Sequence, residues 1–190
     1  MSVGASAAAK RAPSGEAVVR DAGEGDLSAV QAIYAHHVLT GLGSFEEQPP
    51  DAAEIARRFR AVVEAGLPYL VAELEGKVVG YAYAAPFRPR PAYRHTVENS
   101  VYVSPEYGGR GVGRALLVKL IERCTASGKR QMVAVIGGGY ANEGSARLHQ
   151  ALGFREAALL KSVGRKFDRW LDTLMMQLPL GPGDNKPPGR

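Results

Sequence analysis

The spacing of apolar positions predicts two helices in the first third of the chain. After Asp26, and again after Asp51, apolar residues recur every three or four positions, which is the spacing of one helix face. Asp26 is a typical N-cap, Asp51 with Glu54 is a capping-box-like pair, and Gly66 is a typical stop. The positions expected to face inward are Leu27, Val30, Ile33, Tyr34, His37 and Val38 in the first helix, and Ile55, Phe59, Val62 and Val63 in the second.

The rest of the chain alternates short apolar runs with two further helical patterns. Glu75-Gly76 is a typical hairpin turn between two of the runs. The antiparallel neighbours come first and one strand–helix–strand crossover lies in the middle, so the order predicts an α+β fold rather than a doubly wound sheet. The expected strands cover 17–20, 69–73, 77–85, 94–103, 131–136, 154–163 and 170–178, and the expected helices cover 112–127 and 145–152, the second closed by Gly153.

Length and composition predict one domain. The chain has 190 residues, and we expect a domain over 17–180 between disordered tails at 1–16 and 181–190, which are rich in small residues, glycine or proline. No apolar run approaches the roughly 18 residues that cross a bilayer, and the N-terminus lacks the order of a signal peptide. The single cysteine, Cys124, excludes an intrachain disulfide and is expected to serve packing. These features predict a cytoplasmic protein that does not enter a membrane.

The charge and the histidines exclude two classes of partner. The formal net charge is +5, but the basic residues are scattered and do not alternate with aromatic residues, so we expect no nucleic acid. An anionic small molecule explains the balance equally well. His36 and His37 are adjacent on a helix, so only one of them faces inward, and no third ligand has the spacing of a metal site. We therefore expect no metal.

A glycine-rich segment between a strand and a helix is the strongest chemical signal. The strand 99–103 ends at Ser104-Pro105, the segment 108–113 follows, and a helix begins after it. Glycine amides beside a helix N-terminus typically hold a phosphate, and Arg110 and Arg114 add positive charge. A P-loop would end in Gly-Lys-Ser/Thr, which is missing, and a Rossmann site would follow the first strand of a parallel series. An acyl-CoA pyrophosphate loop fits the context, and a glycine-rich turn without a ligand is the alternative.

Together with this loop, five segments resemble a known family. They cover 69–76, 80–93, 96–105, 133–137 and 147–154. The chain resembles the GCN5-related N-acetyltransferase superfamily over 17–180, and within it the phosphinothricin and methionine sulfoximine acetyltransferases. Residues 86–93, followed by Thr96-Val-Glu98, are the part most specific to that subfamily. The resemblance implies a mixed, mostly antiparallel sheet of about seven strands, splayed between the fourth and fifth and flanked by about four helices.

The resemblance also implies acetyl-CoA as co-substrate, held by three parts of the chain. Its pantetheine arm would pair with the backbone of Val101, Tyr102 and Val103. Asn142 and Ser145 match positions on the pantetheine side, and the segment 137–142 is slightly longer than usual. Gly108 stands where the family usually has Gln or Arg, so a side chain is lost there. The pyrophosphate loop would consist of Gly108, Gly109, Arg110, Gly111, Val112, Gly113 and Arg114.

Two residues are candidates for proton transfer. The reaction would be the attack of an amine on a thioester, and an amine that is protonated at neutral pH needs a base first. Glu98 matches the family's proposed base, and a salt-bridged strand carboxylate is the alternative. His149 lies where many relatives carry a Tyr facing the sulfur, and its imidazole would protonate the leaving thiolate. A helix histidine packed against the sheet is the alternative. The N–H of Val103 is a natural donor to the oxyanion.

The substrate side would rest on Arg88, Arg90 and Tyr93. Two arginines suit the carboxylate or phosphinate oxygens of a glutamate-like amino acid, and a solvated basic loop is the alternative. Phe45 matches an aromatic residue that lines the pocket in the family, or it is an ordinary core residue. Ser100 matches a hydroxyl that faces the pocket. The resemblance further implies a homodimer.

Three functions follow in order of preference. The first is N-acetylation of the α-amine of phosphinothricin, methionine sulfoximine or methionine sulfone. The second is acetylation of another amine, in a polyamine, an aminoglycoside or a protein N-terminus, although the basic 88–90 segment disfavours cationic acceptors. The third is an acyl-CoA-binding module without turnover.

Overall fold

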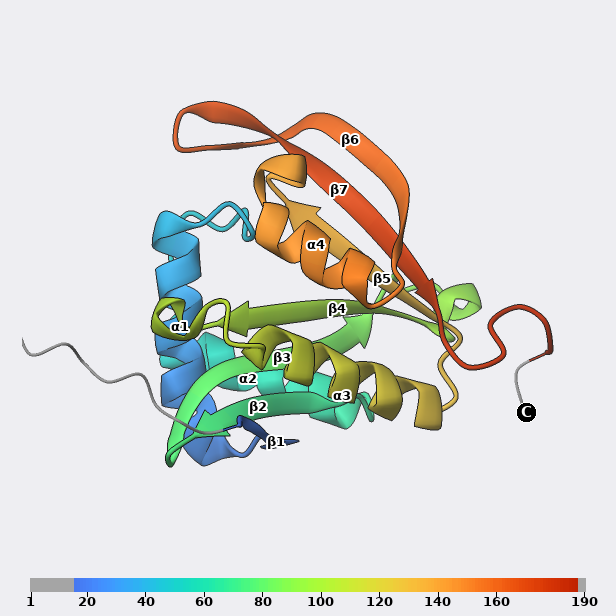
Figure 1. Cartoon of the computed structure of the whole chain (residues 1–190), viewed down its shortest axis with the longest axis horizontal. Coiled ribbons are helices and arrows are strands. Elements are labelled where there is room, and N and C mark those ends of the chain that lie inside the picture. Colours follow the sequence, from blue (N-terminus) through green and yellow to red (C-terminus); the bar gives the residue numbers. More distant parts are fainter. Residues whose placement is uncertain (1–15, 188–190) are drawn as a thin grey trace, which may run out of the picture.

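The chain folds into one seven-stranded sheet that carries helices on both faces (Figure 1). The computed structural model describes residues 16–187. Within them the strands are β1 (Val18–Asp21), β2 (Tyr69–Leu74), β3 (Lys77–Pro86), β4 (Thr96–Val103), β5 (Gln131–Gly137), β6 (Arg155–Lys166) and β7 (Arg169–Pro179). The α helices are α1 (Leu27–Thr40), α2 (Ala52–Glu64), α3 (Val112–Ala126) and α4 (Glu143–Ala151). This confirms the predicted α+β fold and its order of elements.

The sheet order is β1-β2-β3-β4-β5-β7-β6, and every neighbouring pair is antiparallel except β4 and β5. The parallel pair is short: its register runs from Thr96 opposite Gln131 to Asn99 opposite Ala134 and then stops. Both strands continue beyond this point, so they diverge, as Figure 1 shows between the two strands. The predicted splay between the fourth and fifth strands is confirmed.

Two apolar layers hold the helices on the sheet. On one face, Leu116, Leu117 and Leu120 of α3 are fully buried against the strands. On the other face, under α1 and α2, the rings of Tyr69, Tyr81 and Tyr83 stack with centroids 5.0–6.3 Å apart. Tyr102 of β4 and Tyr34 of α1 extend the second layer, with ring centroids 5.1 Å apart. Both layers pack on β2, β3 and β4. They therefore fix the position of β4 where it diverges from β5, and the space between these two strands is called the gap below.

The predicted N-cap positions Asp51 and Asp26 are confirmed, and one inward-facing position is wrong. Asp51 accepts a hydrogen bond from the N–H of Glu54 at 2.8 Å, as an N-cap does. Asp26 is the N-cap residue of α1 but makes no side-chain cap, because its carboxylate accepts from the N–H of Gly23 and pairs with Arg20, each at 2.8 Å. Val63 was expected to face inward but is 51% exposed. Successive helix residues point about 100° apart, so Val62 takes the inward direction and Val63 does not.

Three further features concern the ends of the chain and its apolar parts. The predicted tail at 1–16 falls almost entirely outside the described residues, as do positions 188–190 of the other. Residues 181–187 form consecutive turns, and the guanidinium of Arg130 donates to the carbonyl of Pro187 at 2.9 Å.

Cys124 is buried in α3, and burial raises the pKa of its thiol to about 12, which suits its expected packing role. No helix among the described residues is long and apolar enough to cross a membrane.

Replacing Leu117 with alanine tests the α3 layer. The side chain is fully buried, so its loss should lower the free energy of unfolding by about 2–5 kcal/mol, measured by urea unfolding. The Lys119→Ala variant, on the exposed side of the same helix, should change it by less than about 1 kcal/mol. Equal losses in the two variants would show that α3 does not pack on the sheet in this way.

Candidate active site

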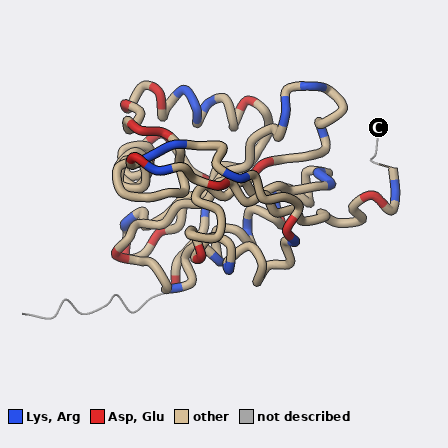
Figure 2. The backbone as a smooth tube through the Cα atoms, turned by 90° about the horizontal axis from the view of Figure 1, so that it is seen from above, with Lys and Arg blue, Asp and Glu red and all other residues tan. Residues whose placement is uncertain are grey.

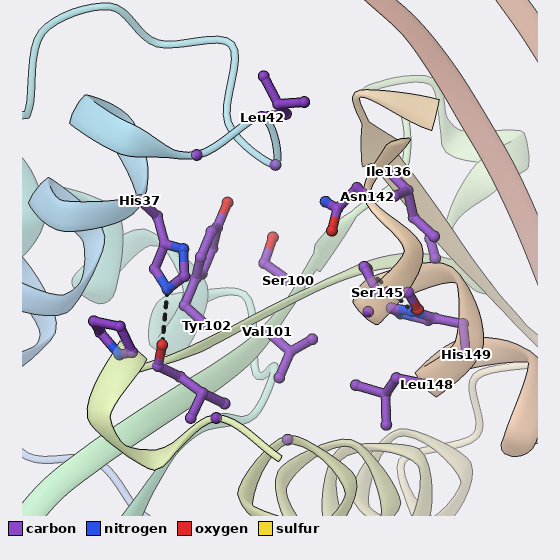
Figure 3. A pocket seen from close by; sticks show the side chains of 18 of the residues that line it. His37, Leu42, Ser100, Val101, Tyr102, Ile136, Asn142, Ser145, Leu148 and His149 are labelled. Atoms are coloured by element: carbon purple, nitrogen blue, oxygen red, sulfur yellow. Dashed lines mark hydrogen bonds between the residues drawn. The ribbon is translucent and has the colours of Figure 1, made fainter. Parts of the chain in front are cut away.

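A cavity of about 860 Å³ lies where β4 and β5 diverge (Figure 3). Its walls include four successive residues of β4, from Ser100 to Val103. Side chains along a strand alternate between the two faces of a sheet, so one cavity lined by all four must pass through the sheet. Tyr102 packs against α1 on one side, and Val103 packs beside Gly113 of α3 on the other. The cavity therefore connects the two faces through the gap.

The backbone of β4 offers unpaired groups inside this gap. The N–H of Ser104 donates to Val79 of β3 at 2.8 Å, and neighbouring residues of a strand direct their backbone groups to opposite edges. Val101 and Val103 consequently turn their N–H and C=O groups toward β5. In the part of the chain that the structure describes, the β4–β5 register ends before these residues. An extended ligand with amide groups could pair with this edge in the place of a strand.

The imidazole of His37 in α1 is hydrogen-bonded to one of these backbone groups. Its Nε2 lies 2.8 Å from the carbonyl oxygen of Val103 (Figure 3). A carbonyl only accepts, so Nε2 carries the proton. Burial lowers the pKa of His37, and the hydrogen bond to Val103 opposes this effect. The imidazole thus fixes the end of β4 from the α1 side and leaves the N–H of Val103 facing the gap.

The glycine-rich loop meets the cavity at the start of α3. Gly111 is the N-cap residue with φ +80°, a left-handed conformation that glycine adopts without strain, and it offers no side-chain cap. The first amides of a helix have no partner within it, so those of 112–114 can donate to an anion. The N–H of Gly108 already donates to Pro105 at 3.3 Å. Most of the predicted loop lines the cavity, namely Gly108, Gly109, Gly111, Val112, Gly113 and Arg114.

Arg110 lies apart from the cavity wall. Its guanidinium lies over the ring of Tyr107, 5.3 Å from the ring centroid. Its side chain therefore packs on Tyr107 and is not directed into the cavity.

Asn99, His149 and Ser145 form a buried hydrogen-bonded group at the apex of the gap. The side-chain amide of Asn99 donates to the carbonyl of Val133 in β5 at 3.1 Å. Its Oδ1 lies 3.0 Å from Nε2 of His149, and Nδ1 of His149 donates to the carbonyl of Ser145 at 2.8 Å. Burial lowers the pKa of His149, and the Ser145 carbonyl opposes this. Both ring nitrogens already face protein oxygens, so a proton given to a ligand would have to leave one of these contacts.

Glu98 occupies the other face of the sheet. It precedes Ser100 by two positions, so both side chains lie on the α1 side of β4, and Ser100 lies opposite Tyr83 in the register. Burial raises the pKa of Glu98, and the charge of Arg88 opposes this. Glu98 is not among the residues that line the cavity, whereas Ser100 on the same face of β4 is. A half-buried carboxylate with a raised pKa is a typical candidate for a base.

Of the predicted substrate residues, Ser100 lines the cavity, whereas Arg88, Arg90 and Tyr93 do not. Arg88 is over the ring of Phe87, 5.1 Å from its centroid, and Phe87 contacts Tyr93 with centroids 5.8 Å apart. Tyr93 is 42% exposed, and the carbonyl of Arg90 accepts from its N–H at 3.0 Å. A smaller hollow of about 210 Å³ lies here, lined partly by Phe87, Tyr93 and Val133. Arg88 and Glu98 are close enough for their charges to interact, whereas Arg90 makes only a turn contact.

Phe45 lies behind the cavity wall formed by Gly41, Leu42 and Gly43. It is 38% exposed and packs against the backbone of Gly137 and Gly164. Asn142, by contrast, lines the cavity, and its amide donates to the carbonyl of Gly137 at 3.2 Å.

The sequence held signals for the residues that its interpretation missed. His37 was in the inward-facing set of its helix, and Asn99 is a residue type that is depleted in strand interiors. Neither signal identified the partner, because Val103 and His149 lie 66 and 50 positions away. Among the described residues, no group of three His, Cys, Asp or Glu side chains is placed to hold a metal ion.

Comparison with known proteins agrees with this geometry. The model of the acetyltransferase (GNAT) family matches residues 30–154. The chain is 56% identical to the phosphinothricin N-acetyltransferase of Alcaligenes faecalis over 90% of this chain and 85% of that protein. It is 42% identical to the L-methionine sulfoximine/L-methionine sulfone acetyltransferase of Pseudomonas aeruginosa over 90% and 99%. The phosphinothricin acetyltransferase of Sinorhizobium meliloti, solved with acetyl-CoA, superposes with a TM-score of 0.89 at 51% identity, covering 92% and 94%.

The chain therefore belongs to the GNAT acetyltransferase family. It is a phosphinothricin N-acetyltransferase-like acyltransferase, which confirms the family resemblance expected from the sequence.

The pH dependence of stability tests the environment of His37. Its pKa is lower in the folded protein than in the unfolded chain, so the unfolded chain binds the proton first as the pH falls. Its contribution to the free energy of unfolding is present above about pH 6.5 and is lost as the pH falls through the folded-state pKa. The His37→Gln variant does not titrate at this position, so its unfolding free energy between pH 7 and 5 should decrease less steeply than that of the wild type. Parallel curves would contradict the buried position of the ring.

Proposed function

We propose that the chain transfers the acetyl group of acetyl-CoA to the α-amine of a small glutamate-like or methionine-derived amino acid. Phosphinothricin, methionine sulfoximine and methionine sulfone are the substrates considered. The observation that supports this most is the single cavity through the sheet. It joins the amides at the start of α3, on one face, to the side where Glu98 and Arg88 lie. A cofactor and an amine that enter from opposite faces would meet in the gap.

Residues on the α3 side would hold the cofactor. The amides of 109–114 would bind the pyrophosphate, with Arg114 adding charge. The gap-facing groups of Val101 and Val103 would pair with the pantetheine amides. Asn142 and Ser145 line the facing wall from the α4 side. The thioester would then lie between β4 and β5, where the N–H of Val103 can donate to an oxyanion.

Glu98 would act as the base. An α-amine is mostly protonated at neutral pH and attacks only after it loses a proton. Glu98 would take that proton, directly or through one water. The amine nitrogen then forms a bond to the acyl carbon, and the C–S bond breaks as CoA leaves as a thiolate. His149 is the candidate donor to this thiolate, and its contacts with Asn99 and Ser145 support an orienting role as well.

The side beyond Glu98 would bind the rest of the amino acid. Arg88 lies within electrostatic range of Glu98, so it can bind the anionic tail of a substrate whose amine points at that carboxylate. Arg90 and Tyr93 belong to the same segment, and Ser100 and Phe45 would complete the pocket near the gap. A cationic acceptor such as a polyamine would be repelled here, so the geometry favours an anionic amino acid.

A homodimer is part of the proposal. The β6–β7 hairpin extends from the sheet (Figure 1) and carries four large apolar side chains that are 43–65% exposed. Exposed apolar patches of this kind are typical of protein interfaces. Figure 2 shows acidic and basic residues interspersed along the described backbone. The four residues are Leu160, Val163, Phe167 and Trp170.

Replacing Glu98 with glutamine tests the base. Loss of the base should lower kcat by about 10²–10⁴-fold, measured by thiol release from acetyl-CoA with phosphinothricin or methionine sulfoximine. The wild-type kcat/KM should rise with pH as the carboxyl of Glu98, whose pKa is raised by burial, loses its proton, and the variant should lack this limb. Glu75→Gln, in an exposed turn, is the matched control. Tight acetyl-CoA binding without turnover of any amine in the wild type would favour a binding module.

Replacing Arg88 with glutamine tests the anionic substrate. Removal of a charge-assisted contact should raise the KM for the amino acid by about 10-fold or more, with the KM for acetyl-CoA unchanged. Arg90→Gln should act in the same direction but more weakly. Arg94→Gln, at an exposed residue whose guanidinium donates to the carbonyl of Pro91, is the control. If the double variant of Arg88 and Arg90 acetylates the amino acids as well as the wild type, a different acceptor amine becomes the better candidate.

A further inference from the structure

Lys166, at the end of β6, is a buried ammonium that the acetyl-transfer chemistry does not use. The residue is 3% exposed. Its Nζ donates to the carbonyl of Ser44 at 2.7 Å and to the carbonyl of Gly41 at 3.1 Å. These two acceptors lie at the ends of the 41–44 segment, which connects α1 toward α2. One side chain from the β6–β7 hairpin therefore binds a loop that lies more than 120 positions earlier in the chain.

The same loop packs on two further points of the sheet. A Cβ on Gly164 would collide with the ring of Phe45, so this ring lies directly against the backbone of β6. A Cβ on Gly137, at the end of β5, would lie 2.5 Å from the carbonyl of Leu42 and 2.9 Å from the Phe45 ring. The loop thus lies between the ends of β5 and β6. Its polar contacts include Lys166 and the hydroxyl of Tyr34, which lies 2.9 Å from that of Ser44.

The choice of lysine at this position needs a reason beyond stability. Burial lowers the pKa of Lys166, and the more distant charges of Glu47 and Glu46 oppose this. Among the described residues, Lys166 makes no ion pair within 4.0 Å. Burying an ammonium without a counter-ion is costly, whereas an apolar side chain would fill the same space cheaply. The two carbonyl contacts are what the ammonium contributes in return.

The loop that Lys166 binds forms one wall of the cavity. Gly41, Leu42 and Gly43 line it, and Figure 3 shows Leu42 across the cavity from Val101 and Leu148. Leu148 lies beside Gly113 at the start of α3. The 41–44 segment forms a wall of the cavity that is remote from the 108–114 loop. A shift of this segment would therefore change that wall and leave the 108–114 loop in place.

We propose that Lys166 is a positioning residue for the acceptor amine, acting through the 41–44 segment. It fixes the wall formed by Leu42 and, with Gly164, the ring of Phe45, and so sets the width of the cavity at the end where the amine meets the thioester. Lys166 contacts neither substrate. The identity of the amine in this proposal rests on the proposed function. The position of the 41–44 segment does not.

The test compares Lys166→Met with Lys161→Met. The first removes the ammonium at similar size, and the second removes an exposed lysine of the same strand that pairs with Asp172. Hydrogen exchange measured by mass spectrometry should be at least about 10-fold faster for the amides of 41–46 in Lys166→Met, with 108–116 unchanged. The KM for phosphinothricin or methionine sulfoximine should rise about 10-fold, while calorimetry gives a Kd for acetyl-CoA within about 2-fold of the wild type. Lys161→Met should match the wild type in all three measurements.

A second variant covers the case in which Lys166→Met does not fold. Gly164→Ala pushes the Phe45 ring away without touching the ammonium, and it should give the same split between amine KM and cofactor Kd. The proposal is overturned if exchange at 41–46 is unchanged, or if the cofactor Kd weakens as much as the amine KM. If the wild type acetylates none of the amino acids, the proposed function fails, and the exchange of 41–46 alone then decides for or against Lys166 as the residue that holds the loop.

Discussion

The end of pairing between β4 and β5 is the constraint on which the rest of the site depends. Up to Asn99 and Ala134 the two strands form an ordinary parallel ladder, and beyond them they separate. Asn99 stands at this point with its amide bound to β5 and its oxygen beside His149 of α4. The hydrogen bond from the buried amide of Asn99 to Val133 would be lost if either strand shifted, so it favours one arrangement of the two strands. The apex of the gap is therefore fixed from three elements at once.

The open edge of β4 suits the extended, amide-containing ligand of the proposed function. A buried backbone group without a partner costs about 1–3 kcal/mol, so an exposed edge inside a cavity favours anything that pairs with it. His37 binds the carbonyl of Val103 from one side, and the start of α3 provides free amides on the other. Because side chains alternate along β4, Glu98 faces the opposite side of the sheet from Val101 and Val103. In the proposed function, the same strand would present its backbone to the cofactor and a carboxylate to the amine.

The sequence predicted the order of elements and the glycine-rich loop before α3 because both depend on local patterns. Apolar periodicity located the four helices, and the run from Pro105 to Gly113 located the loop. The N-cap position of Asp26 was predicted, but its side-chain partners Arg20 and Gly23 were not, because a capping rule does not consider such contacts. The partners of His37, Asn99 and Lys166 lie 34 to 125 positions away, so only the folded chain brings them together. Among the predicted site residues, those of the cofactor side line the cavity, whereas Arg110, Phe45 and the 88–93 segment lie outside its wall.

The central claim is that cofactor and amine meet in the gap from opposite faces of the sheet. A crystal structure with acetyl-CoA and phosphinothricin tests it most directly. The account predicts the thioester between the 101–103 segment of β4 and the 135–137 segment of β5, with the pyrophosphate at the amides of 109–114. It also predicts the amine nitrogen within one water of the Glu98 carboxylate, on the face away from α3. A cofactor bound elsewhere, or an amine that reaches the thioester from the α3 side, would contradict the account.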